Sequence, residues 1–267
     1  MSTLEDRKIE KPVIVIVPAS FSPPSLYRDV VERLGDTGFK TIVIDLPSIG
    51  SRAPLAGATM TDDVNCIRSI TNELVDDGKD IILVMHSYGG ICGTESTKGV
   101  SKVEREKLRK EGGIIRLLYI SSPVPEVGGS IASQMGANMP DFITVEGDYL
   151  VAEPNGCART NFSDLPSARG IELAKTMLVH SAVSFTGTLT HPGYQDTPVS
   201  YLVCEEDQAV PVEVQKSIIA RIQKESGHGV DIQFCKSGHF PSVSRTEEVV
   251  RNIRRAAGET LREITTL

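Results

Sequence analysis

Short apolar runs recur along the chain, and the first of them is continuous and β-branched, as a strand buried on both faces requires. The predicted strands are 12–17, 41–45, 81–85, 114–120, 199–204 and 230–235. Segments with helical spacing of apolar residues lie between them, and the predicted helices are 22–34, 62–77, 167–180, 212–226 and 245–265, the last with a stripe of Val249, Val250, Ile253 and Leu261. This alternation predicts an α/β fold with a doubly wound, mostly parallel sheet and right-handed crossovers.

Ser87 follows the apolar run at 81–85 after a single residue, and residues 86–90 read His-Ser-Tyr-Gly-Gly. A strand that ends at a serine followed by glycines predicts a tight strand-to-helix turn, which exposes the hydroxyl. The N-terminus of the following helix favours developing negative charge. Crowding at such a turn requires small residues two positions on either side of the serine, and Gly89 meets this requirement whereas Met85 does not. The pentapeptide alone is also compatible with a structural serine in a glycine-rich turn.

Two further polar residues follow predicted strands later in the chain. Asp207 comes after the strand at 199–204, and His239 comes after the strand at 230–235. An imidazole is the natural acceptor for a serine proton near neutral pH, and a carboxylate can orient that imidazole. The three residues therefore form a candidate nucleophile, base and acid.

Other residues compete for two of these roles. Glu205 and Glu206 precede Asp207 closely enough to be alternatives for the acid, and Glu126 is a lower-ranked alternative one strand earlier. The other histidines are His86, His180, His191 and His228. His86 adjoins the serine, but successive side chains of a strand point to opposite faces, so we expect it to pack beside the site.

The chain order serine, aspartate, histidine is that of the α/β-hydrolase triad. With this order the chain resembles the α/β-hydrolase superfamily along nearly its whole length. It is most similar to the small single-domain branch that contains plant methylesterases and hydroxynitrile lyases. Fungal members of that branch carry a charged Ser-Lys-x-Glu-Arg stretch, which residues 101–105 match. The resemblance implies that Ser87 is the nucleophile, His239 the base and Asp207 the orienting acid.

The alternation of strands and helices lapses from 124 to 197, where glycines and prolines are frequent. In this position the resembled family inserts a cap, and ligands of parallel sheets bind at the carboxyl ends of the strands. We expect one domain, with a core of 1–123 and 198–267 and a cap of 124–197 inserted after the strand at 114–120. The alternative is a long excursion that does not contact substrate.

An acyl-transfer site also needs donors for an oxyanion. The resemblance assigns one to the backbone N–H of Tyr88 and the other to the loop after the first strand, with Ser20 preferred and Ala19 as the fallback. Relatives commonly have His-Gly at positions 18 and 19, so this loop departs from the family pattern. Phe21 and Tyr27 are candidates to line the substrate pocket, although core packing explains them equally well.

These features predict a serine hydrolase that cleaves an ester, lactone or thioester of a small molecule. One alternative is a carbon–carbon lyase or a cyclase of secondary metabolism that uses the same triad as acid and base. Hydroxynitrile lyases have a lysine after the catalytic histidine and a threonine in the first loop, whereas this chain has Phe240 and Ala19. A second alternative is a small-molecule receptor without turnover, because the fold alone does not define the activity.

Composition narrows the expected setting. The chain of 267 residues has a formal net charge of −7, which disfavours nucleic acid and anionic membranes as partners. It lacks an apolar segment of membrane-spanning length, and its polar beginning is unlike a secretory signal. Five cysteines without metal-ligand spacing fit a reducing compartment. We therefore expect a cytoplasmic monomer or homodimer that acts on a small molecule, without a metal or other cofactor.

Overall fold

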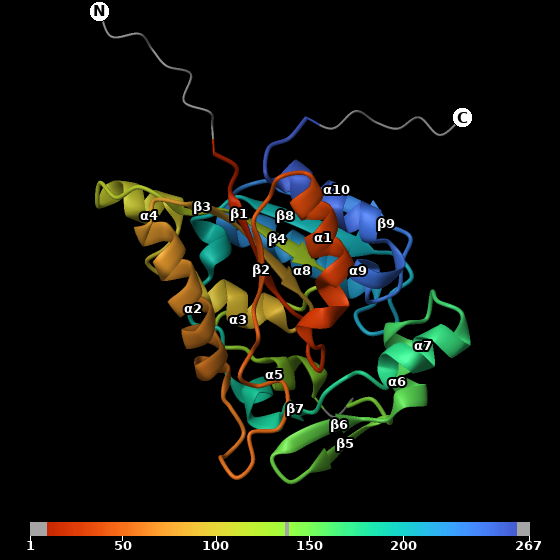
Figure 1. Ribbon diagram of the computed structural model, residues 1–267. Coiled ribbons are helices and arrows are strands. Elements are labelled where there is room, and N and C mark those ends of the chain that lie inside the picture. Colours follow the sequence, from red (N-terminus) through yellow and green to blue (C-terminus); the bar gives the residue numbers. More distant parts are fainter. Residues whose placement is uncertain (1–9, 137–138, 261–267) are drawn as a thin grey trace, which may run out of the picture.

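The computed structural model of the protein describes residues 10–136 and 139–260. Within these ranges, six strands form the main sheet in the order β2-β1-β3-β4-β8-β9, and every neighbouring pair is parallel (Figure 1). The strands are β1 (Val13–Val17), β2 (Thr41–Val43), β3 (Asp80–His86), β4 (Gly113–Ile120), β8 (Val199–Cys204) and β9 (Val230–Cys235). The predicted parallel α/β fold is confirmed.

Helices cover both faces of this sheet because alternate residues of each strand point to opposite sides. One hydrophobic cluster joins residues such as Val15 and Leu83 to three helices: α2 (Met60–Asp76), α3 (Gly89–Ser96) and α8 (Val212–Ser226). The other cluster joins residues such as Ile16 and Val84 to α1 (Arg28–Asp36) and α10 (Thr246–Ala256). Three short helices complete the core: η1 (Pro24–Tyr27), α4 (Lys102–Lys107) and α9 (Pro241–Ser244).

The segment 124–197 folds around a second, antiparallel sheet in the order β5-β6-β7. Its strands are β5 (Ile143–Glu146), β6 (Tyr149–Ala152) and β7 (His180–Ser181). Its helices are α5 (Ile131–Met135), α6 (Pro154–Asn161), α7 (Ser167–Ala174), η2 (Ala182–Thr186) and η3 (Gly193–Gln195). Figure 1 shows most of this segment gathered at the lower end of the molecule, beyond the main sheet.

Two predicted helices are shorter than expected. The helix predicted over 167–180 ends at Ala174, and the chain then turns so that the N–H of Leu178 donates to the carbonyl of Phe21 at 2.7 Å. The helix predicted over 245–265 ends at Ala256, because Gly258 takes a φ of +85°, a left-handed conformation that ends helices. Its predicted stripe residue Leu261 lies outside the described residues.

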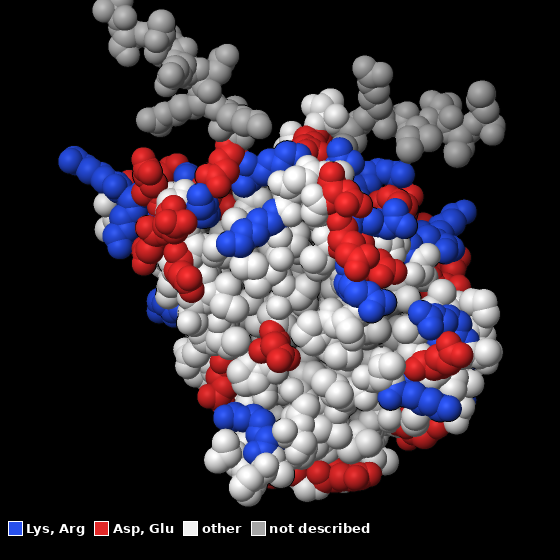
Figure 2. Space-filling view, viewed as in Figure 1, with Lys and Arg blue, Asp and Glu red and all other residues white. Residues whose placement is uncertain are grey.

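Charged side chains of both signs are mixed on the face shown in Figure 2, with many of them at the upper end around α4, α1 and α10. The five cysteines are free thiols, and four of them are buried. Among the residues that the structure describes, no helix is both long and apolar enough to cross a membrane.

Candidate active site

Ser87 lies in the turn between β3 and α3, at the carboxyl edge of the main sheet. Its φ of +51° is in the left-handed region, which is uncommon for a residue with a side chain. Its N–H donates to the carbonyl of Ile120 at 3.1 Å, and its own carbonyl accepts from Gly90 at 2.8 Å. This is the tight strand-to-helix turn that the sequence predicts, and strain of this kind is often found at functional sites.

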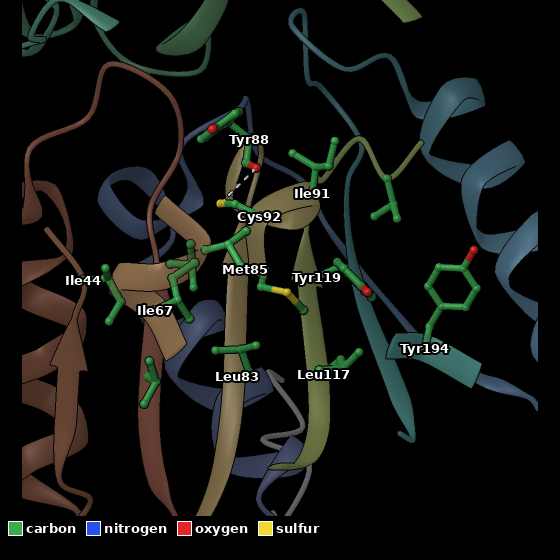
Figure 3. Packing of buried hydrophobic residues seen from close by; sticks show 14 of the residues in the cluster. Ile44, Ile67, Leu83, Met85, Tyr88, Ile91, Cys92, Leu117, Tyr119 and Tyr194 are labelled. Atoms are coloured by element: carbon green, nitrogen blue, oxygen red, sulfur yellow. Dashed lines mark hydrogen bonds between the residues drawn. The ribbon is translucent and has the colours of Figure 1, made fainter. Parts of the chain in front are cut away.

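The residues around this turn are closely packed. A Cβ at Gly89 would lie 2.5 Å from the carbonyl oxygen of Val17, so only glycine fits there. Met85, which stands where a small residue was expected, is fully buried beneath α3 (Figure 3). A Cβ at Gly93 would lie 2.6 Å from both Cγ and Sδ of Met85. Gly93 thus provides the space that the larger residue in the strand requires.

The structure brings Ser87, His239 and Asp207 into one hydrogen-bonded chain. The Oγ of Ser87 lies 2.9 Å from Nε2 of His239, and Nδ1 of His239 lies 2.7 Å from Oδ2 of Asp207. All three side chains are buried, and they follow strands β3, β9 and β8 at the same edge of the sheet. In this geometry the serine hydroxyl donates to Nε2, and the Nδ1 proton is held by the carboxylate.

Asp207 is held by donors on both carboxylate oxygens. Oδ1 accepts from the backbone N–H groups of Ala209 and Val210 at 2.7 and 2.9 Å. Oδ2 accepts from the hydroxyl of Ser121 as well as from His239. Burial alone would raise the pKa of this carboxyl, but the nearby imidazole and these hydrogen bonds bring the pKa below its usual value. Asp207 is therefore ionised at neutral pH.

The other acidic candidates lie on the surface. Glu205, Glu206 and Glu126 are all exposed, and among the described residues Asp207 is the carboxylate within hydrogen-bond distance of His239. The ambiguity left by the sequence is thus resolved geometrically in favour of Asp207, although its catalytic role stays a prediction.

His86 packs beside the site and contacts the loop that carries His239. Its Nε2 lies 2.7 Å from the carbonyl oxygen of His239, and its Nδ1 lies 2.7 Å from the hydroxyl of Tyr27. Burial, with a smaller contribution from the nearby His239, lowers the pKa of His86 to about 3. His86 is therefore neutral and cannot act as a proton shuttle at physiological pH.

Among the described residues, the remaining histidines make no hydrogen bond to the side chain of Ser87. His180 is fully buried, which lowers its pKa to about 3, and its Nε2 lies 2.9 Å from the hydroxyl of Ser184. His191 is half-buried and His228 is exposed.

Two backbone N–H groups beside the cavity remain candidates for the oxyanion donors that the sequence predicts. Those of Ser20 and Tyr88 have no acceptor among the described residues, and both residues line the same cavity as Ser87. The prediction that Ala19 could serve as the fallback donor must be corrected. Its N–H donates to the hydroxyl of Tyr27 at 2.9 Å, so it is already engaged.

The loop that carries Ser20 is anchored by the segment 124–197. Phe21 has a φ of +64°, and its carbonyl accepts from Leu178 at 2.7 Å. Its N–H points to Nδ1 of His180 at 3.4 Å. The N–H and the carbonyl of this strained residue are thus held by His180, the first residue of β7, and by Leu178 just before it, which fixes the position of the neighbouring Ser20.

The side chain of Tyr88 is fixed as well. Its hydroxyl donates to Oδ2 of Asp63 at 2.6 Å, and its ring stacks on Phe185 at a centroid distance of 5.4 Å. The other oxygen of Asp63 accepts from the N–H of Ser48 at 2.9 Å. Burial raises the pKa of Asp63 to about 6.

A cavity of about 750 Å³ opens onto Ser87 and His239. The segment 124–197 contributes much of its apolar wall, including Ile131, Met135, Phe142, Ile143 and Phe185. No Asp, Glu, Lys or Arg is among the described residues that line it. Phe21 lines this cavity as predicted. Tyr27 does not, because its hydroxyl is buried between Ala19 and His86.

The contacts of Ser121, Asp63 and His180 were not predicted from the sequence. Ser121 had a usable signal, because it is the first residue after the strand at 114–120, the same placement that marked Ser87. Asp63 and His180 had none, since both lie in predicted helices, where carboxylates and histidines are usually solvated. Among the described residues, no group of three or more His, Cys, Asp or Glu side chains is arranged to hold a metal ion.

Comparison with known proteins identifies the family of this fold. Residues 14–252 match the profile of the alpha/beta hydrolase family. The chain belongs to the α/β hydrolase family. It is 32% identical over 255 residues to the α/β hydrolase nvfD of Aspergillus novofumigatus. This alignment covers 94% of this chain and 98% of that protein. It is also 32% identical over 250 residues to the probable hydrolase R7 of a Phoma species, with 93% and 99% covered.

Solved structures share the same fold. An Arabidopsis methylesterase superimposes on this α/β hydrolase with a TM-score of 0.69 and 15% identity, over 92% of this chain and 99% of that one. The resemblance stated from the sequence, to fungal α/β hydrolases related to plant methylesterases, is thereby confirmed.

Proposed function

We propose that this α/β hydrolase is a serine hydrolase that cleaves a carboxylic ester, lactone or thioester of a small, uncharged organic molecule. The observation that carries the proposal is the continuous chain from Ser87 through His239 to Asp207, placed at the wall of a cavity large enough for a small organic ligand.

In the proposed mechanism, Ser87 Oγ attacks the substrate carbonyl while Nε2 of His239 accepts the hydroxyl proton. The resulting oxyanion is held by the N–H groups of Ser20 and Tyr88. The imidazolium, stabilised by Asp207, returns its proton to the departing alcohol or thiol, which leaves Ser87 acylated. A water molecule then attacks the acyl group with His239 as base, releasing the acid and restoring the serine.

The substrate class follows from the cavity. A mainly apolar wall without charged side chains among the described lining residues disfavours multiply charged ligands, because their desolvation would not be compensated. In this proposal the segment 124–197 acts as a cap, since it supplies much of that wall. Two curated relatives named as hydrolases agree with a hydrolytic activity.

Labelling with a fluorophosphonate tests the nucleophile. We expect one phosphonyl group per chain on Ser87, none in Ser87→Ala, and an unchanged melting temperature in that variant. Esters of increasing acyl length, each in a neutral and an anionic form, then define the substrate class. Preference for the multiply anionic forms would contradict the apolar pocket, and absence of both labelling and turnover would favour a lyase or a receptor.

The acid is tested with a matched pair of variants. Asp207→Asn should remove most of the ester turnover, because the amide cannot stabilise the imidazolium of His239. Glu206→Gln makes the same chemical change on a neighbouring exposed residue and should retain activity. The reverse result would transfer the role to Glu206.

A further inference from the structure

Ser121 lies between the strand that carries the nucleophile and the strand that leads to the acid. It follows β4, which pairs with β3 on one side and β8 on the other. Its N–H donates to the carbonyl of Leu202 in β8 at 3.2 Å, while the preceding carbonyl, of Ile120, accepts from Ser87. The backbone at this point therefore fixes both neighbouring strand ends.

The side chain of Ser121 makes a contact that the mechanism above does not use. It is fully buried, and its hydroxyl donates to Oδ2 of Asp207, the same oxygen that accepts the Nδ1 proton of His239. The two donors on Oδ1 come from the loop that follows Asp207 itself. Apart from His239, Ser121 is thus the described donor that ties this carboxylate to another part of the fold.

The backbone of Ser121 is held in an unfavourable conformation. Its φ of +40° lies in the left-handed region, where glycine would be relaxed and a residue with a Cβ is strained. Strained residues of this kind persist where the surrounding structure holds them, and they cluster at functional sites. The chain nevertheless has a serine, with its hydroxyl group, at a position where glycine would be less strained.

We propose that Ser121 is a positioning residue that acts through Asp207 on the orientation and basicity of His239, an inference that rests on the proposed function. Its hydroxyl limits rotation of the Asp207 carboxylate, and the hydrogen bond partly neutralises the negative charge on Oδ2. Without that hydrogen bond, the carboxylate would hold the imidazolium form of His239 more strongly and in a less defined geometry.

Two variants separate this role from a structural one. Ser121→Ala removes the hydroxyl and keeps the strain, whereas Ser121→Gly removes the hydroxyl and relieves the strain. The glycine variant should melt at a higher temperature than the alanine variant. Both should nevertheless lose kcat about tenfold on a neutral ester with little change in KM, as expected for loss of a hydrogen bond to a charged group.

The pH dependence gives the readout that a structural role would not change. In both variants the acidic limb of the kcat/KM profile should move to higher pH by roughly half a pH unit, because the imidazolium is stabilised. A stable Ser121→Gly protein with wild-type kcat and an unmoved profile would overturn the proposal.

The low-field proton NMR signal of the Nδ1–H of His239, which bonds to Asp207, keeps this test separate from that of the proposed function. The signal is assigned with His239→Gln, and it needs no substrate. A changed chemical shift and faster solvent exchange of this proton in both Ser121 variants supports the positioning role even if no ester is turned over. An identical signal in all three proteins overturns it, whatever the activity.

Discussion

The Nε2 atom of His86 lies 2.7 Å from the backbone carbonyl of His239, so the residue before the proposed nucleophile holds the loop of the proposed base. Because a carbonyl only accepts, Nε2 carries the proton and Nδ1 accepts from the hydroxyl of Tyr27. That hydroxyl in turn accepts from the N–H of Ala19. A buried chain of hydrogen bonds thus joins the loop that carries Ser20 to the loop that carries His239 through a neutral imidazole.

Replacing His86 by phenylalanine should disturb both loops. The change leaves the carbonyl of His239 without a donor and the O–H of Tyr27 without an acceptor, and we expect a loss of about 1–3 kcal/mol in the free energy of unfolding. Turnover per folded molecule should also fall, because the imidazole of His239 loses its fixed position. Urea denaturation and ester kinetics measure the two effects.

Tyr27→Phe is the matched control for this prediction. It breaks the same chain one step further from His239, so it should lower stability while affecting turnover less than His86→Phe. Wild-type turnover in His86→Phe would show that the chain does not position the base.

The buried histidines predict loss of stability in mild acid. The pKa values of His86 and His180 are lowered to about 3, so between roughly pH 6.5 and 3 the unfolded chain binds more protons than the folded one. Stability must therefore fall as the pH decreases through this range. Asp63 opposes this trend between roughly pH 4 and 6, because its pKa is raised to about 6.

The net change is measurable by denaturation at two pH values. From pH 7 to pH 5 we expect a loss of about 2–3 kcal/mol in the free energy of unfolding. Asp63→Asn removes the opposing group, so the loss over the same range should be larger in that variant. Equal stability of the wild type at the two pH values would contradict the assignment of buried, neutral histidines.

The close contact of Met85 with Gly93 predicts coupling between the two positions. Gly93→Ala alone should destabilise the protein by about 1–3 kcal/mol, because its Cβ would collide with the side chain of Met85. In a Met85→Ala background the space is vacant, and the same substitution should be neutral or stabilise α3 by up to about 1 kcal/mol. A double-mutant cycle measures this difference. Additive effects would refute the conclusion that Gly93 is needed to make room for the side chain of Met85.

Arg105 belongs to the charged motif at 101–105, and the structure gives it a stabilising role. Its guanidinium is nearly buried and donates to the carbonyls of Val75, Glu111 and Gly112 and to the carboxylate of Asp76. These contacts join the end of α2 to the start of β4, at the sheet edge opposite the triad.

Arg105→Met should therefore lower the free energy of unfolding by about 2–4 kcal/mol, since it leaves buried carbonyls unpaired. Turnover per folded molecule should not change. Lys102→Met, on the same helix, removes a half-buried ion pair with Asp80 of β3 and should cost less than about 1 kcal/mol. Similar costs for the two variants in urea denaturation would contradict this account.

The sequence predicted the main sheet well because buried parallel strands carry a strong signal. The strands at 199–204 and 230–235 are observed with the predicted bounds, since each is an apolar or alternating run followed by turn residues. The strands β5, β6 and β7 were not predicted. They have only two to four residues each, and exposed residues such as Val145 give them no clear pattern.

The candidate site could be predicted only as far as strand ends mark it. Asp207 and His239 follow strands, so parallel topology brings them to the edge where Ser87 lies. The roles of Tyr27 and Ala19 depend on one side-chain hydrogen bond between them, which no sequence pattern encodes. The link from Ser121 to Asp207 likewise depends on the order in which β4 and β8 pair.

The most direct test of the proposed hydrolase is isolation of its acyl-enzyme. The protein is mixed with an activated neutral ester, quenched in acid within the first turnover and digested. The mass of the peptide that contains Ser87 is then measured by mass spectrometry. We predict that the acyl group is found on Ser87, in an amount approaching one per chain, and that Ser87→Ala carries none. Acylation at another residue, or wild-type turnover by Ser87→Ala, would contradict the account.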